Sequence, residues 1–90
     1  SIVAMLGEIP VLIDAGNPGM AAGGMGDVLT GVIAAMLAQF GRSHFEATIC
    51  GVLLHAAAGD AAARDGGERG LLPSDLFPHL RRLANPVSHA

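Results

Sequence analysis

The sequence contains no Lys, Trp or Tyr, and only three Phe and one Cys among its 90 residues. Five Arg against eight acidic residues give a net charge of −3, and no basic stripe is present to attract a nucleic acid. The lone Cys50 excludes an internal disulfide and a zinc site made of thiolates, so a reducing, intracellular setting is the default. No apolar run approaches the roughly 18 residues of a membrane helix, and the first residues lack the basic segment of a signal peptide. We therefore expect a cytoplasmic protein that binds neither nucleic acid nor membrane.

Small residues take the place of the missing large ones. The chain has 16 Ala and 13 Gly, and it is 51% hydrophobic but only 14% charged. This composition excludes a disordered tail, which needs low hydrophobicity and high charge. It predicts packing by close approach of backbones rather than by aromatic side chains. Ninety residues form one domain at most, and no internal repeat divides them.

Two short apolar runs, 1–6 and 9–13, flank Gly7-Glu8 at the start of the chain. Their β-branched residues and the Gly-containing turn predict a β-hairpin or two neighbouring strands. Pro10 cannot donate a hydrogen bond to a sheet, so we expect it at a strand start or on a sheet edge. Because neither run alternates cleanly between apolar and polar residues, we expect both strands to be covered on both faces.

Three helices are predicted further along the chain. Helical periodicity marks the first over 27–40, with Gly41 as its C′ residue. A capping box at Ser43 opens the second, which runs to about residue 64 or 65, is closed by Gly66-Gly67 and is apolar nearly all round. The third runs from 73 to about 83. The inward positions are Leu29, Val32, Ile33, Met36, Leu37 and Phe40 in the first helix and Leu76, Phe77, Leu80 and Leu83 in the third.

These elements cannot cover one another within 90 residues. The prediction is therefore an α/β fold, of which this chain is the C-terminal part: a β-hairpin, a glycine-rich loop, two buried helices and a short C-terminal helix. Burial of apolar surface is worth roughly 25 cal/mol per Å². We expect the isolated chain to aggregate or to pair with another copy through its strand edge or helix faces, rather than remain a monomer.

The segment from Asp14 to Asp27 holds five glycines and one proline, which excludes regular structure. It is too apolar for a solvated linker, so its backbone is expected to lie close to something. The segment ends in Gly23-Gly24-Met25-Gly26-Asp27, directly before the first predicted helix. We expect the N–H groups around Gly24 to Asp27 to point into one concavity at the helix start.

That arrangement suits phosphoryl transfer to an alcohol. The first turn of a helix offers unpaired N–H groups and the positive end of the dipole, and glycines let a phosphate approach the backbone. A carboxylate at the same point can take the hydroxyl proton. An isolated Asp before a helix is more often only an N-cap. The segment is neither a Walker loop, since no Gly-Lys-Ser/Thr follows, nor the dinucleotide fingerprint, whose acidic residue lies about 20 residues on.

The glycine-rich segment resembles the signature of the NAD(P)H-hydrate dehydratases, which are ribokinase-superfamily proteins related to carbohydrate kinases. The residues that carry the resemblance are Gly16-Asn17-Pro18-Gly19-Met20-Ala21 and Gly23-Gly24-Met25-Gly26-Asp27-Val28-Leu29-Thr30-Gly31. It continues through 51–55, 58–60, 67–72 and 74–76, and so covers nearly the whole chain. The Gly-x-Gly-Asp core indicates only the superfamily, whereas the longer run is specific to the dehydratases. The resemblance implies a ribokinase-like three-layer domain.

The resemblance also implies a reaction. These enzymes repair hydrated NADH or NADPH with ADP (bacterial and archaeal type) or ATP (eukaryotic type) as phosphoryl donor, together with Mg²⁺. The hydroxyl of the hydrate is phosphorylated, and phosphate is then eliminated to restore the dihydronicotinamide. A homo-oligomer, a tetramer in the family, is implied as well. The family's Lys-Gly-containing nucleotide loop lies upstream and is absent here, so this chain cannot form a complete active site alone.

The resemblance implies roles for particular residues. Asp27 contacts the hydrate and acts as the base. Asn17 is a further candidate for substrate binding, because it lies in the glycine-rich loop, which either lines the site or only shapes it. The glycine before the Asp contacts the adenine nucleotide in the family's motif, and this is Gly26. From the glycine spacing before the helix we also expect Gly23, Gly24 and Met25 to bind nucleotide or phosphate.

The other polar residues suggest structural roles. His55 and Asp60 are five apart on the second predicted helix and share no face well, so we expect a hydrogen-bonded core histidine. Cys50 lies among apolar neighbours and is expected to be an inert packing residue. Asp14 is a candidate cap for the loop. His44, His79 and His89 lack metal-ligand spacing, so no protein metal site is expected.

Two alternatives stay open. One is another enzyme of the same superfamily, a kinase for a small hydroxylated metabolite. The other is a non-catalytic binding or assembly module left by truncation.

Overall fold

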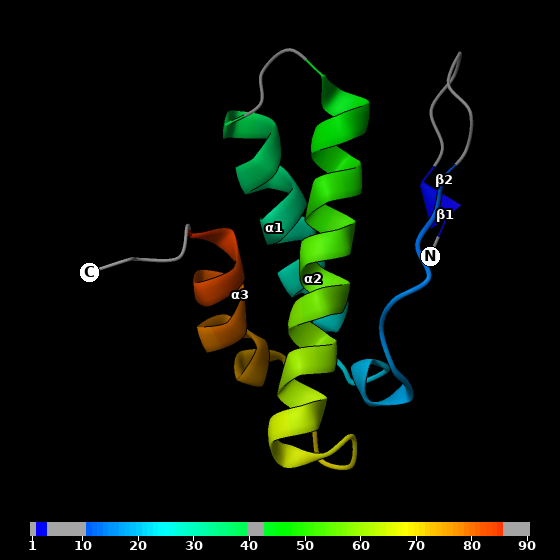
Figure 1. Cartoon of the computed structure of the whole chain (residues 1–90), viewed down its shortest axis with the longest axis vertical. Helices are drawn as coiled ribbons and strands as arrows, with labels where there is room; N and C mark the ends of the chain where they lie inside the picture. The colour runs from blue at the N-terminus through cyan, green and yellow to red at the C-terminus, as the bar shows by residue number, and fades with distance from the viewer. Residues whose placement is uncertain (1, 4–10, 40–42, 86–90) are drawn as a thin grey trace.

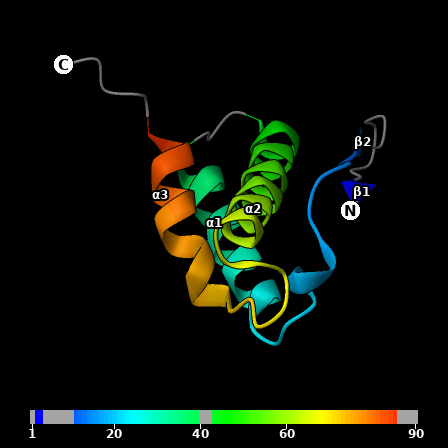
Figure 2. The ribbon, with the colours of Figure 1, turned by 60° about the horizontal axis from the view of Figure 1, so that its bottom comes forward.

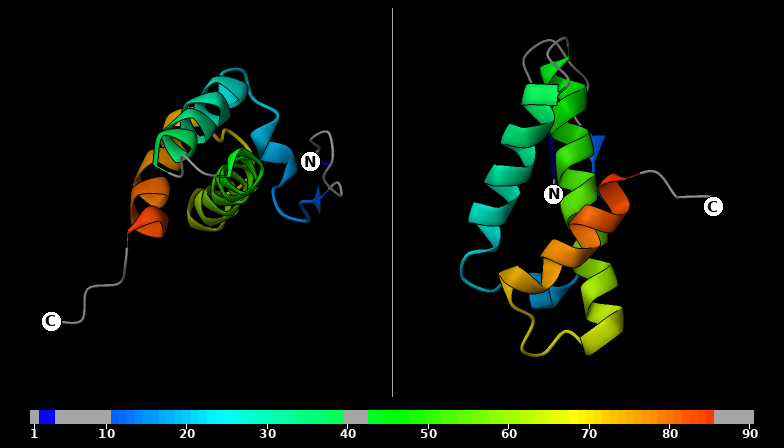
Figure 3. Two further views of the ribbon diagram at one scale, coloured as in Figure 1. Left: turned by 90° about the horizontal axis from the view of Figure 1, so that it is seen from above. Right: turned by 90° about the vertical axis from the view of Figure 1, so that its left-hand side faces the viewer.

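The structure is a computed structural model that describes residues 2–3, 11–39 and 43–85. The long helix α2 (His44–Gly66) lies at its centre. Figures 1 and 3 show α1 (Met25–Gln39) and α3 (Phe77–Ala84) on one side of α2. The strands β1 (Ile2–Val3) and β2 (Val11–Leu12) lie on the other side. Two short 3₁₀ helices, η1 (Pro18–Met20) and η2 (Pro73–Leu76), precede α1 and α3.

The predicted hairpin pairing is confirmed. Strands β1 and β2 are antiparallel, with Ile2 opposite Leu12 and Val3 opposite Val11. The expected turn at Gly7-Glu8 and the position of Pro10 lie outside the described residues. The prediction that both faces are covered is wrong for this chain, because Val3 is buried whereas Leu12 is 72% exposed. Among the described elements, α2 packs against β1.

Helix α1 begins at Met25, two residues before the predicted start. Gly24 has a φ of +90°, and this left-handed turn lets the helix begin at the next residue. The predicted helix end at Phe40 and the C′ residue Gly41 lie outside the described residues.

The second and third helices lie close to their predicted bounds. At the start of α2 the Ser43 hydroxyl accepts a hydrogen bond from the Glu46 N–H at 3.4 Å, as the capping box predicts. Helix α2 ends at Gly66, and Gly67 follows with a φ of +88°. The third helix begins as η2 and continues as α3 to Ala84, one residue beyond the prediction.

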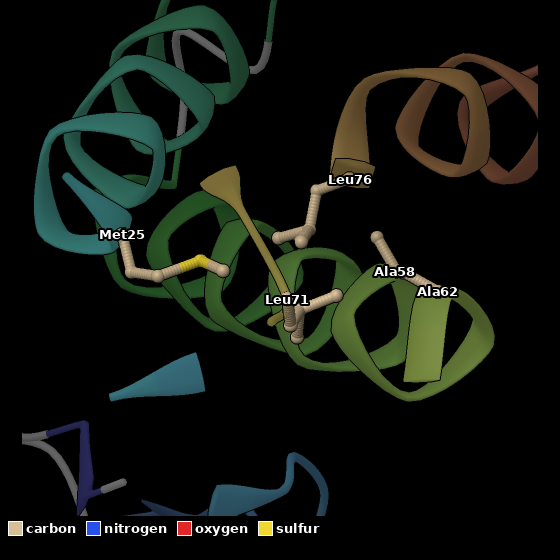
Figure 4. Packing of buried hydrophobic residues seen from close by; sticks show 5 residues of the cluster. All are labelled: Met25, Ala58, Ala62, Leu71 and Leu76. Carbon is tan, nitrogen blue, oxygen red and sulfur yellow. The ribbon is translucent and has the colours of Figure 1, made fainter. Parts of the chain in front are cut away.

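Small residues bring the helices close together, as the composition predicts. A Cβ on Gly51 of α2 would fall 3.1 Å from Cγ1 of Ile33 in α1, and Ala47 and Ala58 are fully buried. The core forms two clusters around α2. One joins α2 to the start of α1 and to η2, through Met25, Ala58, Ala62, Leu71 and Leu76 (Figure 4). The other joins α2 to the strand segment through Val3, Ile13, Val52 and Ala56.

Several apolar side chains predicted to face inward are exposed. Phe77 and Leu83 of the third helix are 55% and 45% exposed, and the predicted stripe of α1 is only half-buried. Helix α2 is not buried all round, since Leu53 is 49% exposed. Cys50 is exposed, so its prediction as a packing residue is also wrong. Periodicity identified the apolar faces of the helices, but no element of the described chain covers the exposed side chains on them. None of the described helices combines the length and the apolar character needed to cross a membrane.

Candidate functional site

The glycine-rich loop between β2 and α1 is built around η1. The side-chain Oδ1 of Asn17 caps η1 by accepting a hydrogen bond from the Gly19 N–H at 3.0 Å. The N–H of Met20 donates to the Asn17 carbonyl at 3.1 Å, and that of Ala21 donates to the Pro18 carbonyl at 3.1 Å. The loop therefore has a defined turn where composition predicted only irregular structure.

Asp60 of α2 binds this loop through its carboxylate. Its Oδ2 accepts a hydrogen bond from the Gly16 N–H at 3.0 Å, and its Oδ1 accepts one from Nδ2 of Asn17 at 2.9 Å. These two bonds lower the pKa of Asp60, with the Asn17 amide as the larger cause and the Gly16 N–H as the next. No role was assigned to Asp60 from the sequence, so this contact was missed. The one available signal was a carboxylate in a helical stretch that is otherwise apolar.

Close packing completes the placement of the loop. A Cβ on Gly59 would overlap the Met20 side chain, and one on Gly19 would fall 2.6 Å from the Glu68 carbonyl oxygen. Figure 2 shows η1, the start of α1 and the loop after α2 at the same end of the molecule. These glycines therefore allow segments distant in sequence to meet beside the start of α1.

The start of α1 offers free backbone N–H groups, as the sequence predicts. In the part of the chain that the structure describes, the N–H groups of Gly24, Gly26 and Asp27 have no protein acceptor. The prediction is wrong for Met25, whose N–H donates to the Ala22 carbonyl at 3.3 Å. Gly26 and Asp27 are exposed, and no atom would approach a Cβ on Gly23 or Gly26 within 4 Å. This turn has the free donors and the open space that an anion needs.

A cavity of about 320 Å³ lies beside this helix start. Polar or backbone surface comes from Gly16, Asn17, Gly26 and His55. The apolar lining comes from Ala15, Met20, Met25, Leu29, Val52 and Ala56. Of the residues predicted to face one concavity, Met25 and Gly26 line this cavity, whereas Gly24 and Asp27 do not.

Asp27 is the third residue of α1 and is exposed. It is not the N-cap that an isolated Asp would suggest, because Gly24 precedes the helix. Its position in the first turn places a carboxylate beside the free N–H groups. The predicted role of Asp27 as a base stays a prediction, as do the binding roles of Asn17 and of residues 23–26.

His55 forms part of the cavity wall from α2 and is only 7% exposed. Its Nε2 is buried without a hydrogen-bond partner in the described chain, so the expectation of a fully hydrogen-bonded histidine is wrong for this atom. Burial lowers the pKa of His55, and a hydrogen bond with the backbone of Met25 partly opposes that effect. Sequence reasoning missed His55 as part of the site because periodicity does not distinguish a cavity wall from a core.

The described residues contain no group of three or more His, Cys, Asp or Glu side chains placed to hold a metal ion. The donors near the helix start therefore do not form a protein-only metal site. An Mg²⁺ ion at this position would therefore take most of its ligands from phosphates and water, as it usually does when bound with nucleotides.

A glycine-rich loop, a helix start with free N–H groups and a carboxylate in the same turn define a candidate phosphate-binding site. The family model described as Carb_kinase: NAD(P)H-hydrate dehydratase matches residues 1–82, and the chain belongs to this family. The resemblance carried by the glycine-rich segment is thereby confirmed.

Individual relatives agree with the family. The chain is 60% identical over 72 residues to the bifunctional NAD(P)H-hydrate repair enzyme Nnr of Coxiella burnetii, covering 80% of this chain and 14% of that protein. It is 48% identical over 86 residues to the Escherichia coli enzyme of the same name, covering 96% of this chain and 16% of that protein. It is 42% identical over 76 residues to the ADP-dependent (S)-NAD(P)H-hydrate dehydratase of Neisseria meningitidis, covering 83% of this chain and 25% of that protein. The chain thus spans a quarter or less of these relatives. No solved structure matches it.

Proposed function

We propose that these 90 residues belong to an ADP-dependent NAD(P)H-hydrate dehydratase, a lyase that repairs hydrated NADH and NADPH. In this proposal the chain is the C-terminal part of a ribokinase-like three-layer domain. The observation that carries the proposal is the start of α1, where Gly24, Gly26 and Asp27 present N–H groups without acceptors in the described chain. Family membership and the names of the relatives support the choice of substrate.

The nucleotide phosphates bind at the glycine-rich turn. Gly24 and Gly26 supply free N–H donors, Gly23 and Gly26 leave open space, and Met25 forms part of the cavity wall. The dipole of α1 favours the negative charge there. ADP is the proposed donor because the Neisseria relative is named ADP-dependent. Mg²⁺ accompanies the phosphates and neutralises part of their charge.

Asp27 acts as the base in the transfer. Its carboxylate takes the proton of the hydrate hydroxyl as the hydroxyl oxygen forms a bond to the terminal phosphorus of ADP. The bond between that phosphorus and its bridging oxygen breaks, and AMP leaves. The free N–H groups stabilise the charge on the phosphoryl oxygens during transfer. Elimination of phosphate then breaks the bond between the ring carbon and oxygen, with loss of a ring proton, and restores the dihydronicotinamide.

The test uses the full-length protein that contains this segment. With NADH hydrate as substrate, we expect ADP to drive the return of dihydronicotinamide absorbance, and ATP to do so less well. Asp27→Asn keeps the size of the side chain but removes the base, so turnover should fall by about 10²-fold or more while ADP binding changes far less. Asp65→Asn is the matched control, because Asp65 is exposed near the end of α2.

Other results would contradict the proposal in recognisable ways. A phosphorylated small metabolite without dehydration would favour a kinase of the same superfamily. Full-length protein that binds no nucleotide would favour a non-catalytic module. Near-normal turnover in Asp27→Asn would leave Asp27 without a catalytic role. The homo-oligomer and the cytoplasmic location remain part of the proposal, to be checked by light scattering and by fractionation of cells.

A further inference from the structure

Asp60 joins α2 to the first half of the glycine-rich loop through two hydrogen bonds. Both of its oxygens are used, Oδ2 by the Gly16 N–H and Oδ1 by the Asn17 amide, at 3.0 and 2.9 Å. The partners lie 44 and 43 residues earlier in the chain. The bonds therefore fix two distant segments relative to each other, which a local turn cannot do.

The orientation of the Asn17 amide leaves no alternative arrangement of these bonds. Its Oδ1 accepts from the Gly19 N–H at 3.0 Å, so its Nδ2 must be the atom that faces Asp60. Turning the amide over would place an oxygen against the carboxylate and an NH₂ group against the Gly19 N–H. A carboxylate at position 60 and an amide at position 17 thus match each other, donor to acceptor.

The segment held in this way is one wall of the cavity beside α1. Gly16, Asn17 and Met20 line the cavity together with Gly26 of the helix start. Met20 in turn rests on Gly59, the neighbour of Asp60 in α2. If the wall moved, the space next to Gly26 would change shape even though the first turn of α1 stayed in place.

We propose that Asp60 is a positioning residue for the nucleotide site, which acts through Gly16 and Asn17 and touches no ligand itself. This inference rests on the proposed function, because it takes the cavity beside Gly26 to hold the nucleotide. It also assigns Asn17 a shaping role, since both polar atoms of its side chain are already engaged within the protein.

An exchange of the two side chains tests the proposal in the full-length protein. Asp60→Asn sets an NH₂ group against one of the two donors, and Asn17→Asp sets two carboxylates against each other. The double variant Asn17→Asp with Asp60→Asn restores every bond with one direction reversed. The new carboxylate at position 17 accepts from the Gly19 N–H and from the new amide at position 60, and the oxygen of that amide still accepts from the Gly16 N–H. The double variant retains the net charge and the number of hydrogen bonds.

Two measurements are made on each variant: the affinity for ADP by calorimetry, and the hydrogen-exchange rate of the Gly16 and Gly19 amides. Each single variant should weaken ADP binding by about tenfold or more, the scale for loss of a hydrogen bond to a charged group, and should speed exchange at both amides. The double variant should recover ADP affinity to within about threefold of the parent protein. Asp65→Asn, an exposed carboxylate on the same helix, should change neither quantity.

Parent-like ADP affinity in Asp60→Asn, or a double variant as weak as the singles, would overturn the proposal. A general loss of stability would lower the melting temperature without this pattern of rescue. Failure of the unaltered protein to bind ADP would instead contradict the proposed function. In that case the exchange rates at Gly16 and Gly19 still decide whether Asp60 holds the loop.

Discussion

Gly59 of α2 and Met20 of η1 are in direct contact, and a Cβ built on Gly59 would overlap Sδ, Cε and Cγ of Met20. Gly59→Ala should therefore displace the Met20 side chain. We expect overpacking to cost about 1–3 kcal/mol, of which the better helix propensity of Ala offsets roughly 1 kcal/mol. Adding Met20→Ala removes the overlapping atoms, so the same Gly59→Ala change should then cost less. Denaturant unfolding of the four proteins in this double-mutant cycle measures the coupling.

The matched control is Gly66→Ala, since no atom would lie within 4 Å of a Cβ at that position. It should leave stability within about 0.5 kcal/mol, as is usual for surface changes. Strictly additive costs for Gly59→Ala and Met20→Ala would contradict the contact.

Gly26→Ala should separate ligand binding from stability. A Cβ at this position meets no protein atom within 4 Å, and alanine is the better helix former by roughly 1 kcal/mol. The melting temperature of the full-length protein should therefore stay level or rise. The same methyl group would project toward the space that we assign to phosphate, so ADP affinity should fall by about tenfold or more, an effect of about 1.4 kcal/mol. Unchanged ADP affinity would mean that phosphate does not bind against Gly26.

His55 should make stability depend on pH. Burial lowers its pKa in the folded protein below the usual 6.5. As pH falls below 6.5 the unfolded chain therefore takes up a proton that the folded chain resists, and the free energy of unfolding decreases. That free energy should rise with pH up to about 6.5 and level off above it, and His55→Gln should flatten the rise. Urea unfolding of both proteins across this range gives the difference, and identical slopes would contradict the buried histidine.

Local features of the sequence predicted much of this fold. The hairpin pairing, the cap at Ser43 and the glycine that follows α2 each depend on neighbours in sequence, and all three are present. The predicted start of α1 was two residues too late. The positive φ of Gly24 sets where the helix begins, and composition does not report that angle. Free N–H groups at that start were predictable from glycine spacing before a helix.

Contacts between distant residues could not be predicted in the same way. The bond between Asp60 and Asn17 spans 43 residues and follows no periodicity. Burial was overestimated for a related reason: an apolar face indicates that another element can pack against it, but not that the covering element lies among these residues. Phe77 and Leu53 are the examples, exposed at 55% and 49%.

The exposed apolar side chains predict that the isolated 90-residue chain associates. Leu12 is 72% exposed, and Leu72 and Phe77 are more than half exposed. Exposed apolar side chains of this size favour association or aggregation. Light scattering at high micromolar concentration should report a mass above that of one chain, and replacing Leu12 and Phe77 by Gln should lower it. A stable monomer that melts cooperatively would show that these faces need no partner.

The most direct measurement of the central claim is a crystal structure of the full-length protein with ADP bound. The account predicts a phosphate oxygen within hydrogen-bond distance of the N–H groups of Gly26 and Asp27. It also predicts the Asp27 carboxylate beside the space where the hydroxyl of the hydrate would attack. ADP bound elsewhere, or these N–H groups bonded to protein acceptors in the complete domain, would contradict it.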